Sequence, residues 1–312
     1  MTDKFAPSEA QVLHSEAEAY ELGDGVEVDQ KKAAELYQKA ADLGFIPSMC
    51  RLGEMYMSGQ GVERDHAKGR ELFEKASELG DPEGAFKLGL VYQGGYGVQK
   101  DALTALKLFA FAGERGHVGA VVEIANMNFY GEGIEQDITM AVKWYAMAAE
   151  KGEPVSQFKL GYLFEEGVGI DKDYHAAMRW YKAAAEQGIP EAQFKVASFY
   201  HDGLSVDKND EEALKWYTIA AENQLPPAIF NLATMYYLGE GTDVNMEKAF
   251  ELYLQAAKMD DPDAQFRVGK MYFEGEGTKM DQKEGEVWFR VSASNGNKFA
   301  EEIVNALDNI KK

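Results

Sequence analysis

Apolar residues recur along the chain at spacings of three and four, the pattern of a helix with one buried face. In residues 190–203, the small residue Ala192 is followed by apolar Val196 and aromatic Tyr200. The pattern returns every 36 residues and therefore predicts one helix per repeat, which we call helix A. Its small position holds Ser48, Gly84, Ala120, Ser156, Ala192, Ala228, Ala264 and Ala300.

A second helix, helix B, is predicted in the other half of each repeat. It follows an aspartate or asparagine, whose side-chain oxygen accepts a hydrogen bond from a free amide of the first turn. These capping residues are Asp29, Asp65, Asp101, Asp137, Asp173, Asn209, Asn245 and Asp281. Leucine or tryptophan followed by an aromatic residue fills the middle of the helix. The pairs are Leu36-Tyr37, Leu72-Phe73, Leu108-Phe109, Trp144-Tyr145, Trp180-Tyr181, Trp216-Tyr217, Leu252-Tyr253 and Trp288-Phe289.

The turn between helices A and B has a sequence that resembles a phosphate-binding loop. In one repeat it reads Gly167-Val168-Gly169-Ile170. A phosphate-binding loop occurs once per nucleotide and follows a strand, whereas this sequence recurs in every repeat between two predicted helices. We therefore interpret it as a turn in which glycine adopts a positive φ. The second glycine of the turn recurs at Gly25, Gly61, Gly97, Gly133, Gly169, Gly241 and Gly277, with Ser205 in its place once.

The repeats follow one another without an insertion. A fixed period of this length is typical of a solenoid, in which each repeat buries its apolar face on its neighbours. The sequence therefore predicts an all-α solenoid of eight 36-residue antiparallel helix pairs and a C-terminal capping helix at 297–312. We expect a single domain over residues 1–312. Its repeats are expected at about 9–44, 45–80, 81–116, 117–152, 153–188, 189–224, 225–260 and 261–296.

The repeat also resembles a known family. Between Ser156 and Gly188 the pattern A-x-x-x-LG-x-x-Y-x-x-G-x-GV-x-x-D-x-x-x-A-x-x-WY-x-x-AA-x-x-G stands almost complete. It resembles the Sel1-like repeat, a relative of the tetratricopeptide repeat. The resemblance implies a right-handed superhelix with helix A on its concave face and helix B on its convex face. It also implies an adaptor that holds protein complexes together or acts in signalling.

The charge of the chain narrows the choice of partner. There are 53 acidic against 32 basic residues, which gives a net charge of −21. Such a surface repels nucleic acid and anionic lipid, so we expect neither as a partner. It favours a protein or peptide with basic residues and association that weakens with salt. The same charge is equally compatible with a role in solubility alone.

The composition favours a cytoplasmic protein. Cys50 is the single cysteine, so no disulfide can form within the chain and no oxidising compartment is required. The first twenty residues carry acids and lack the apolar core of a signal peptide. No run of apolar residues approaches the length needed to span a membrane, so membrane insertion is not expected.

No group of residues predicts catalysis, a metal or a cofactor, and we expect no enzyme activity. Cys50 occupies a position otherwise held mostly by phenylalanine, which indicates a small buried residue rather than a nucleophile. The histidines have no metal-binding spacing and are interpreted as ordinary surface or loop residues. They are His14, His66, His117, His175 and His201.

Helix A has two positions whose residue type varies from repeat to repeat. One holds Glu54, Leu90, Asn126, Tyr162, Ser198, Thr234 and Lys270, and the other holds Met57, Gln93, Phe129, Glu165, His201, Tyr237 and Phe273. With the phenylalanine position, they form one stripe at helical spacing. Aromatic side chains surrounded by acids suit a peptide or helix with basic and apolar residues. The candidate partner-binding residues on the concave face are Phe129, Phe158, Tyr162, Glu165, Phe194, His201, Phe230, Tyr237, Phe266 and Phe273.

Several alternatives remain open at this point. The stripe could instead pack against the neighbouring repeat. The leading hypothesis for function is a non-catalytic adaptor that binds a partner in the groove lined by helix A. The second is a regulatory or immunity-type subunit that sequesters or inhibits an enzyme. The third is a hydrolase of small or cell-wall molecules.

Overall fold

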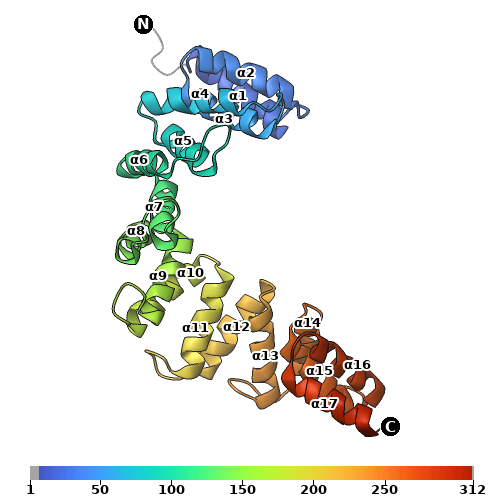
Figure 1. Cartoon of the computed structure of the whole chain (residues 1–312). Coiled ribbons are helices and arrows are strands. Elements are labelled where there is room, and N and C mark those ends of the chain that lie inside the picture. Colours follow the sequence, from blue (N-terminus) through green and yellow to red (C-terminus); the bar gives the residue numbers. More distant parts are fainter. Residues whose placement is uncertain (1–6, 311–312) are drawn as a thin grey trace. The chain divides into compact units, whose positions relative to one another are not determined.

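The computed structural model describes residues 7–310, and these residues form helices joined by short turns. Within these residues there are seventeen helices and no strand (Figure 1). Residues 1–6 and 311–312, the two ends of the expected domain, lie outside the described part. The helices are α1 (Glu9–Leu22), α2 (Gln30–Asp42), α3 (Ile46–Ser58), α4 (His66–Glu78), α5 (Pro82–Gly94), α6 (Ala102–Glu114), α7 (Val118–Tyr130), α8 (Ile138–Glu150), α9 (Pro154–Glu166), α10 (Tyr174–Glu186), α11 (Pro190–Asp202), α12 (Asp210–Glu222), α13 (Pro226–Leu238), α14 (Met246–Ala257), α15 (Pro262–Glu274), α16 (Gln282–Ser294) and α17 (Lys298–Ile310).

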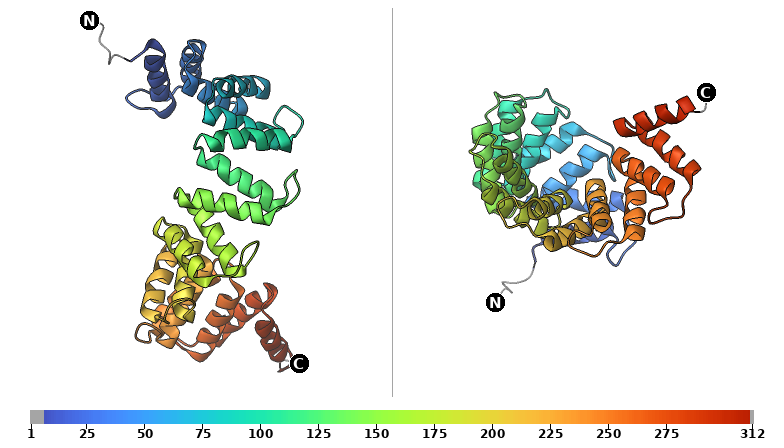
Figure 2. Two further views of the ribbon diagram at one scale, coloured as in Figure 1. Left: turned by 90° about the vertical axis from the view of Figure 1, so that its left-hand side faces the viewer. Right: turned by 90° about the horizontal axis from the view of Figure 1, so that it is seen from below.

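The order of the helices confirms the predicted all-α solenoid. The odd-numbered helices α1 to α15 are helix A of successive repeats, the even-numbered helices are helix B, and α17 follows the eighth pair. Packing is local, because the extensive contacts join helices that follow one another in the chain. The views from two other sides show the same succession of helix pairs along the chain (Figure 2).

The helices group into two compact units. One unit is Met1–Glu153 and contains α1 to α8, and the other is Pro154–Lys312 and contains α9 to α17. The boundary falls between two repeats rather than inside one. Each helix pair therefore lies wholly within one unit.

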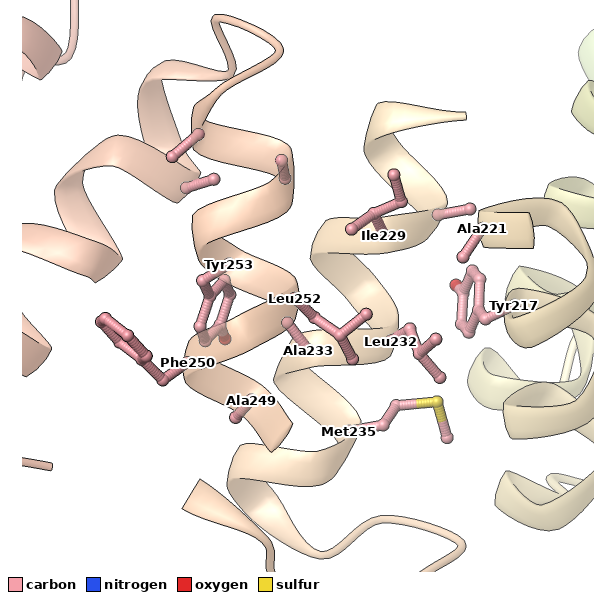
Figure 3. Packing of buried hydrophobic residues seen from close by; sticks show 14 of the residues in the cluster. Tyr217, Ala221, Ile229, Leu232, Ala233, Met235, Ala249, Phe250, Leu252 and Tyr253 are labelled. Atoms are coloured by element: carbon pink, nitrogen blue, oxygen red, sulfur yellow. The ribbon is translucent and has the colours of Figure 1, made fainter. Parts of the chain in front are cut away.

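The aromatic residue of helix B is at the centre of the core of each repeat. Tyr181 of α10 is fully buried and lies over Gly161 of α9, where an added Cβ would fall 2.7 Å from the ring. The same close contact joins Gly53 to Phe73, Gly89 to Phe109 and Gly269 to Phe289. This approach explains why these four repeats carry glycine at that position of helix A. Figure 3 shows the corresponding packing around Tyr217 and Tyr253.

The start of helix B and the turn before it form as predicted. Each of its eight capping side chains accepts a hydrogen bond from an amide of the first turn, as Asp29 does from Lys32 at 2.9 Å. The turn glycines have positive φ, for example 70° at Gly167, and the turn connects two helices. Where glycine is replaced, the backbone keeps the same conformation, with φ of 63° at Ser205.

Glycine is required at the second turn position for a further reason, which the sequence pattern does not reveal. At Gly241 an added Cβ would lie 2.3 Å from the carbonyl oxygen of Asp210, the first residue of α12 in the preceding repeat. The same clash would occur between Gly277 and Met246, at 2.0 Å. The turn of one repeat thus rests directly on the helix B backbone of the repeat before it.

Candidate interaction surface on the odd-numbered helices

The ten candidate residues lie on five odd-numbered helices, and we call the stripe that they form the helix A surface. Tyr162 on α9 is 41% exposed, whereas the other nine are half-buried. Phe129 lies on α7, in the first unit. The rest lie in the second unit, on α9, α11, α13 and α15: Phe158, Tyr162, Glu165, Phe194, His201, Phe230, Tyr237, Phe266 and Phe273.

The phenylalanines of the stripe pack partly within their own repeat. At the phenylalanine position of the second unit, each ring contacts the central aromatic residue of the following helix B, with ring centroids 5.4 to 5.7 Å apart. The pairs in the second unit are Phe158 with Tyr181 at 5.6 Å, Phe194 with Tyr217 at 5.6 Å, Phe230 with Tyr253 at 5.4 Å and Phe266 with Phe289 at 5.7 Å. Part of each phenylalanine is therefore core, and the other part remains open to solvent.

The tyrosines of helix B place their hydroxyls against the two variable positions. Tyr145 donates to the amide oxygen of Asn126 at 2.7 Å, and Tyr253 lies 2.8 Å from the hydroxyl of Thr234. Where helix B carries phenylalanine, one of the two variable positions is apolar. Leu90 and Met57 pack against the hydrophobic clusters that contain Phe109 and Phe73, and the ring centroids of Phe273 and Phe289 lie 6.1 Å apart. The variation along these positions thus reflects in part a match within each repeat. Sequence reasoning treated the positions as free, although the alternation of tyrosine and phenylalanine in helix B was a visible signal.

Glu165 is engaged in contacts that join three helices. It accepts a hydrogen bond from the hydroxyl of Tyr181 on α10, and its other contact is an ion pair with Lys195 on α11 at 2.8 Å. Burial, together with this hydrogen bond to a carboxylate, raises the pKa of the Tyr181 phenol. The half-buried Glu165 carboxylate therefore links two consecutive repeats.

Two further candidates also contact neighbouring elements. The Nδ1 atom of His201 lies 3.0 Å from a carboxylate oxygen of Asp210 on α12. Tyr237 donates a hydrogen bond to Glu276, in the turn after α15, at 2.8 Å. Its phenol pKa is raised by this bond to a carboxylate and by burial. Each side chain keeps part of its surface open to solvent.

Open hollows lie at the variable positions of helix A in both units. In the second unit, a groove of about 490 Å³ brings together Phe230, Phe266 and Phe273 of the candidate set. A smaller hollow of about 180 Å³ includes His201 between α11 and α13. In the first unit, a hollow of about 490 Å³ is lined by Met57 and other residues at the equivalent positions.

A basic position on helix A was missed by the sequence reasoning. It comes directly after the phenylalanine position and holds Arg51, Lys87, Glu123, Lys159, Lys195, Asn231 and Arg267. Several of these cations pair with an acid on the preceding odd-numbered helix: Arg51 with Glu21, Lys87 with Glu54 at 2.6 Å and Lys195 with Glu165 at 2.8 Å. The 36-residue period of basic residues in an acidic chain was the signal that could have identified this ladder.

The remaining candidate chemistry is structural. Cys50 is 6% exposed, and burial and the nearby Asp81 carboxylate raise the pKa of its thiol to about 12. His117 lies in the loop between α6 and α7, where it caps α7 and lies 2.9 Å from Glu83. Within residues 7–310, no cluster of histidine, cysteine and acidic side chains suited to a metal ion occurs.

The repeat itself decides the family. The sequence profile of the Sel1 repeat matches the chain at residues 8–45, 46–81, 82–117, 120–153, 154–189, 190–225, 226–261 and 262–297. The chain belongs to the Sel1 repeat family. Sel1 repeat proteins are generally scaffolds for protein interaction and are typically not catalytic. No helix of the described Sel1 repeats is long and apolar enough to cross a bilayer.

Solved Sel1 repeat structures are similar over almost the whole chain. A protective antigen of uropathogenic Escherichia coli with an SLR fold is 27% identical, with a TM-score of 0.73 over 96% of this chain and 72% of the antigen. A Sel1 repeat protein from Oxalobacter formigenes is 26% identical, with a TM-score of 0.73 over 96% of this chain and 88% of its own. No match was found among curated proteins.

Proposed function

We propose that this Sel1 repeat protein is a non-catalytic adaptor that binds a partner protein or peptide on the helix A surface. The observation that carries the proposal is that positions varying between repeats line open hollows in both units. Half-buried aromatic side chains in such hollows are the usual anchors of protein recognition. The general role of the family as an interaction scaffold supports the same conclusion.

The charge and exposure of the chain suggest the character of the partner. A net charge of −21 favours a partner that carries basic residues overall and disfavours nucleic acid. Tyr162, with 41% of its surface exposed, offers an anchor for an apolar group of that partner. A cytoplasmic location suits the single buried thiol of Cys50.

Affinity capture tests this proposal. The intact protein is immobilised, captured proteins are identified by mass spectrometry, and their binding to a Tyr162→Ala variant is then measured. Removal of an aromatic anchor should weaken binding by about 2 kcal/mol and leave the melting temperature nearly unchanged. Leu103→Ala is the control, because Leu103 is an exposed apolar residue on α6 outside the helix A surface. Equal binding of both variants to every captured protein would count against the helix A surface as the binding site.

A further inference from the structure

The groove in the second unit, which we call the C-terminal groove, has an apolar wall that remains open to solvent. It lies on α13, α15 and α17, and Phe230, Phe266, Phe273 and Phe299 line it. Phe299 of α17 is 68% exposed, and its ring centroid lies 6.1 Å from that of Phe266. Large apolar side chains exposed together in a groove of about 490 Å³ are typical of a binding site.

Arg267 supplies an unpaired charge in this groove. It lines the groove, is half-buried, and makes no hydrogen bond or ion pair with any residue in the range 7–310. In the basic ladder, Arg51 and Lys195 each pair with a glutamate 30 residues earlier. The position 30 residues before Arg267 holds Tyr237 instead.

The other charged side chains that line the C-terminal groove each have a hydrogen-bond or ion-pair partner within the chain. Lys270 lies 3.6 Å from Glu274, and Asp263 accepts a hydrogen bond from Asn297 at 2.7 Å. Tyr237, in the position of the missing glutamate, donates its hydroxyl hydrogen to Glu276. The net result is one guanidinium with free donors beside a wall of phenylalanines.

A half-buried guanidinium without an acceptor is a favourable place for a carboxylate. Arginine presents donors in a fixed fork that matches a carboxylate, and such charge-assisted hydrogen bonds are stronger than neutral ones. Partial exclusion of water by the surrounding rings strengthens the attraction further. The adjoining rings of Phe266 and Phe299 would at the same time cover an apolar side chain of the ligand.

We propose that the C-terminal groove binds a peptide segment of a partner protein in which an aspartate or glutamate stands beside a bulky apolar residue. The carboxylate pairs with Arg267, and the apolar side chain packs against Phe266 and Phe299. This inference rests on the proposed adaptor function and adds the local chemistry of one site. It is compatible with a partner that is basic overall, because net charge governs approach at a distance and the groove governs the final contact.

A peptide selection tests the inference. A displayed library of random peptides, about twelve residues long, is selected against the intact protein, a length that suffices to fill such a groove. Enriched peptides should carry an acidic residue next to an aromatic or aliphatic one. They should bind Arg267→Gln at least about tenfold more weakly, as expected for loss of a charge-assisted hydrogen bond. Lys182→Gln, at an exposed position on α10, is the control with the same change of charge and should bind as the unaltered protein does.

The alternative outcomes separate this inference from the adaptor proposal. Enriched peptides that are basic, or that bind Arg267→Gln unchanged, would overturn the inference. If those peptides lose affinity for Tyr162→Ala instead, the adaptor proposal stands and only the C-terminal groove assignment falls. Failure to enrich any peptide would also overturn the inference, while capture of folded partners would still support the adaptor. A dimer in sedimentation that Arg267→Gln dissociates would assign the groove to a second copy of the chain.

Discussion

At the scale of single residues, the repeats with tyrosine at the centre of helix B depend on a match between its hydroxyl and the residue that faces it. Tyr145 is 1% exposed, and the half-buried Asn126 accepts its hydroxyl hydrogen. In an earlier repeat, Phe109 takes the place of the tyrosine, and Leu90, in the place of Asn126, packs against the cluster that contains Phe109. A buried hydroxyl requires a hydrogen-bond partner, whereas a phenyl ring needs none and permits an apolar residue such as Leu90 at the facing position.

A double-mutant cycle tests this match. Tyr145→Phe leaves the oxygen of Asn126 without its donor and should lower the free energy of unfolding by about 1–2 kcal/mol. Asn126→Leu leaves the tyrosine hydroxyl unpaired and should cost a similar amount. The double variant recreates the Phe109 and Leu90 pair and should recover about 1 kcal/mol relative to the sum. Urea denaturation followed by circular dichroism gives the three values, and strictly additive losses would contradict the match.

Cys50 gives a second prediction at this scale. Because burial and the Asp81 carboxylate raise the pKa of its thiol to about 12, only the unfolded chain ionises it near pH 9. Its contribution to stability should therefore be complete below pH 9 and decline as the pH rises above that value. In the native protein a disulfide reagent should modify the thiol slowly, whereas in denaturant one thiol per chain should react at once. Equal rates in the two states would show that Cys50 is accessible and reactive.

At the scale of elements, glycine is needed both in the turn within a repeat and in the turn between repeats. Gly188, in the turn between α10 and α11, has φ of 91° and no atom within 4 Å of an added Cβ. Gly241 has φ of 69° and lies against the carbonyl oxygen of Asp210. Gly188 is therefore required for its backbone conformation alone. Gly241 is required for its backbone conformation and because a side chain would clash with α12.

Alanine substitution separates these two requirements. Gly188→Ala should lower the free energy of unfolding by about 1–2 kcal/mol, the cost of a left-handed conformation. Gly241→Ala should lower it by at least about 1 kcal/mol more, because the methyl group must displace the backbone of α12. Thermal denaturation of both variants measures the difference. Equal losses would mean that the contact between repeats is relaxed in solution.

Most of the fold could be predicted at this scale, and part of the site could not. Helix positions, capping residues and turn glycines depend on local sequence, so the spacing of Asp29 or Gly167 was sufficient to place them. The acceptor of Tyr145 and the carbonyl near Gly241 depend on how one helix is rotated against the next. Such contacts follow from packing in three dimensions and cannot be read from local sequence. For the same reason, the sequence did not reveal that Glu165 pairs with Tyr181 and Lys195.

At the scale of the whole molecule, the net charge of −21 extends beyond any single repeat. If this charge attracts a basic partner, association should slow by roughly tenfold as ionic strength rises from about 0.05 to 0.5 M, because salt screens distant charges. Dissociation should change less. Surface plasmon resonance with a captured partner separates the two rates. An association rate that does not vary with salt would indicate that the acidic surface serves solubility and does not attract the partner.

The local packing of the helix pairs has a consequence for how such a gene can change in length. Because extensive contacts join only consecutive helices, loss or duplication of one 36-residue block would create no new kind of junction. The ion pairs of the basic ladder restrict which blocks can be lost or duplicated. Loss of residues 190–225 would bring Glu165 opposite Asn231 in place of Lys195 and leave a half-buried carboxylate without its cation. Recombination between copies of the repeat is therefore tolerated best where the acid and the base are exchanged together.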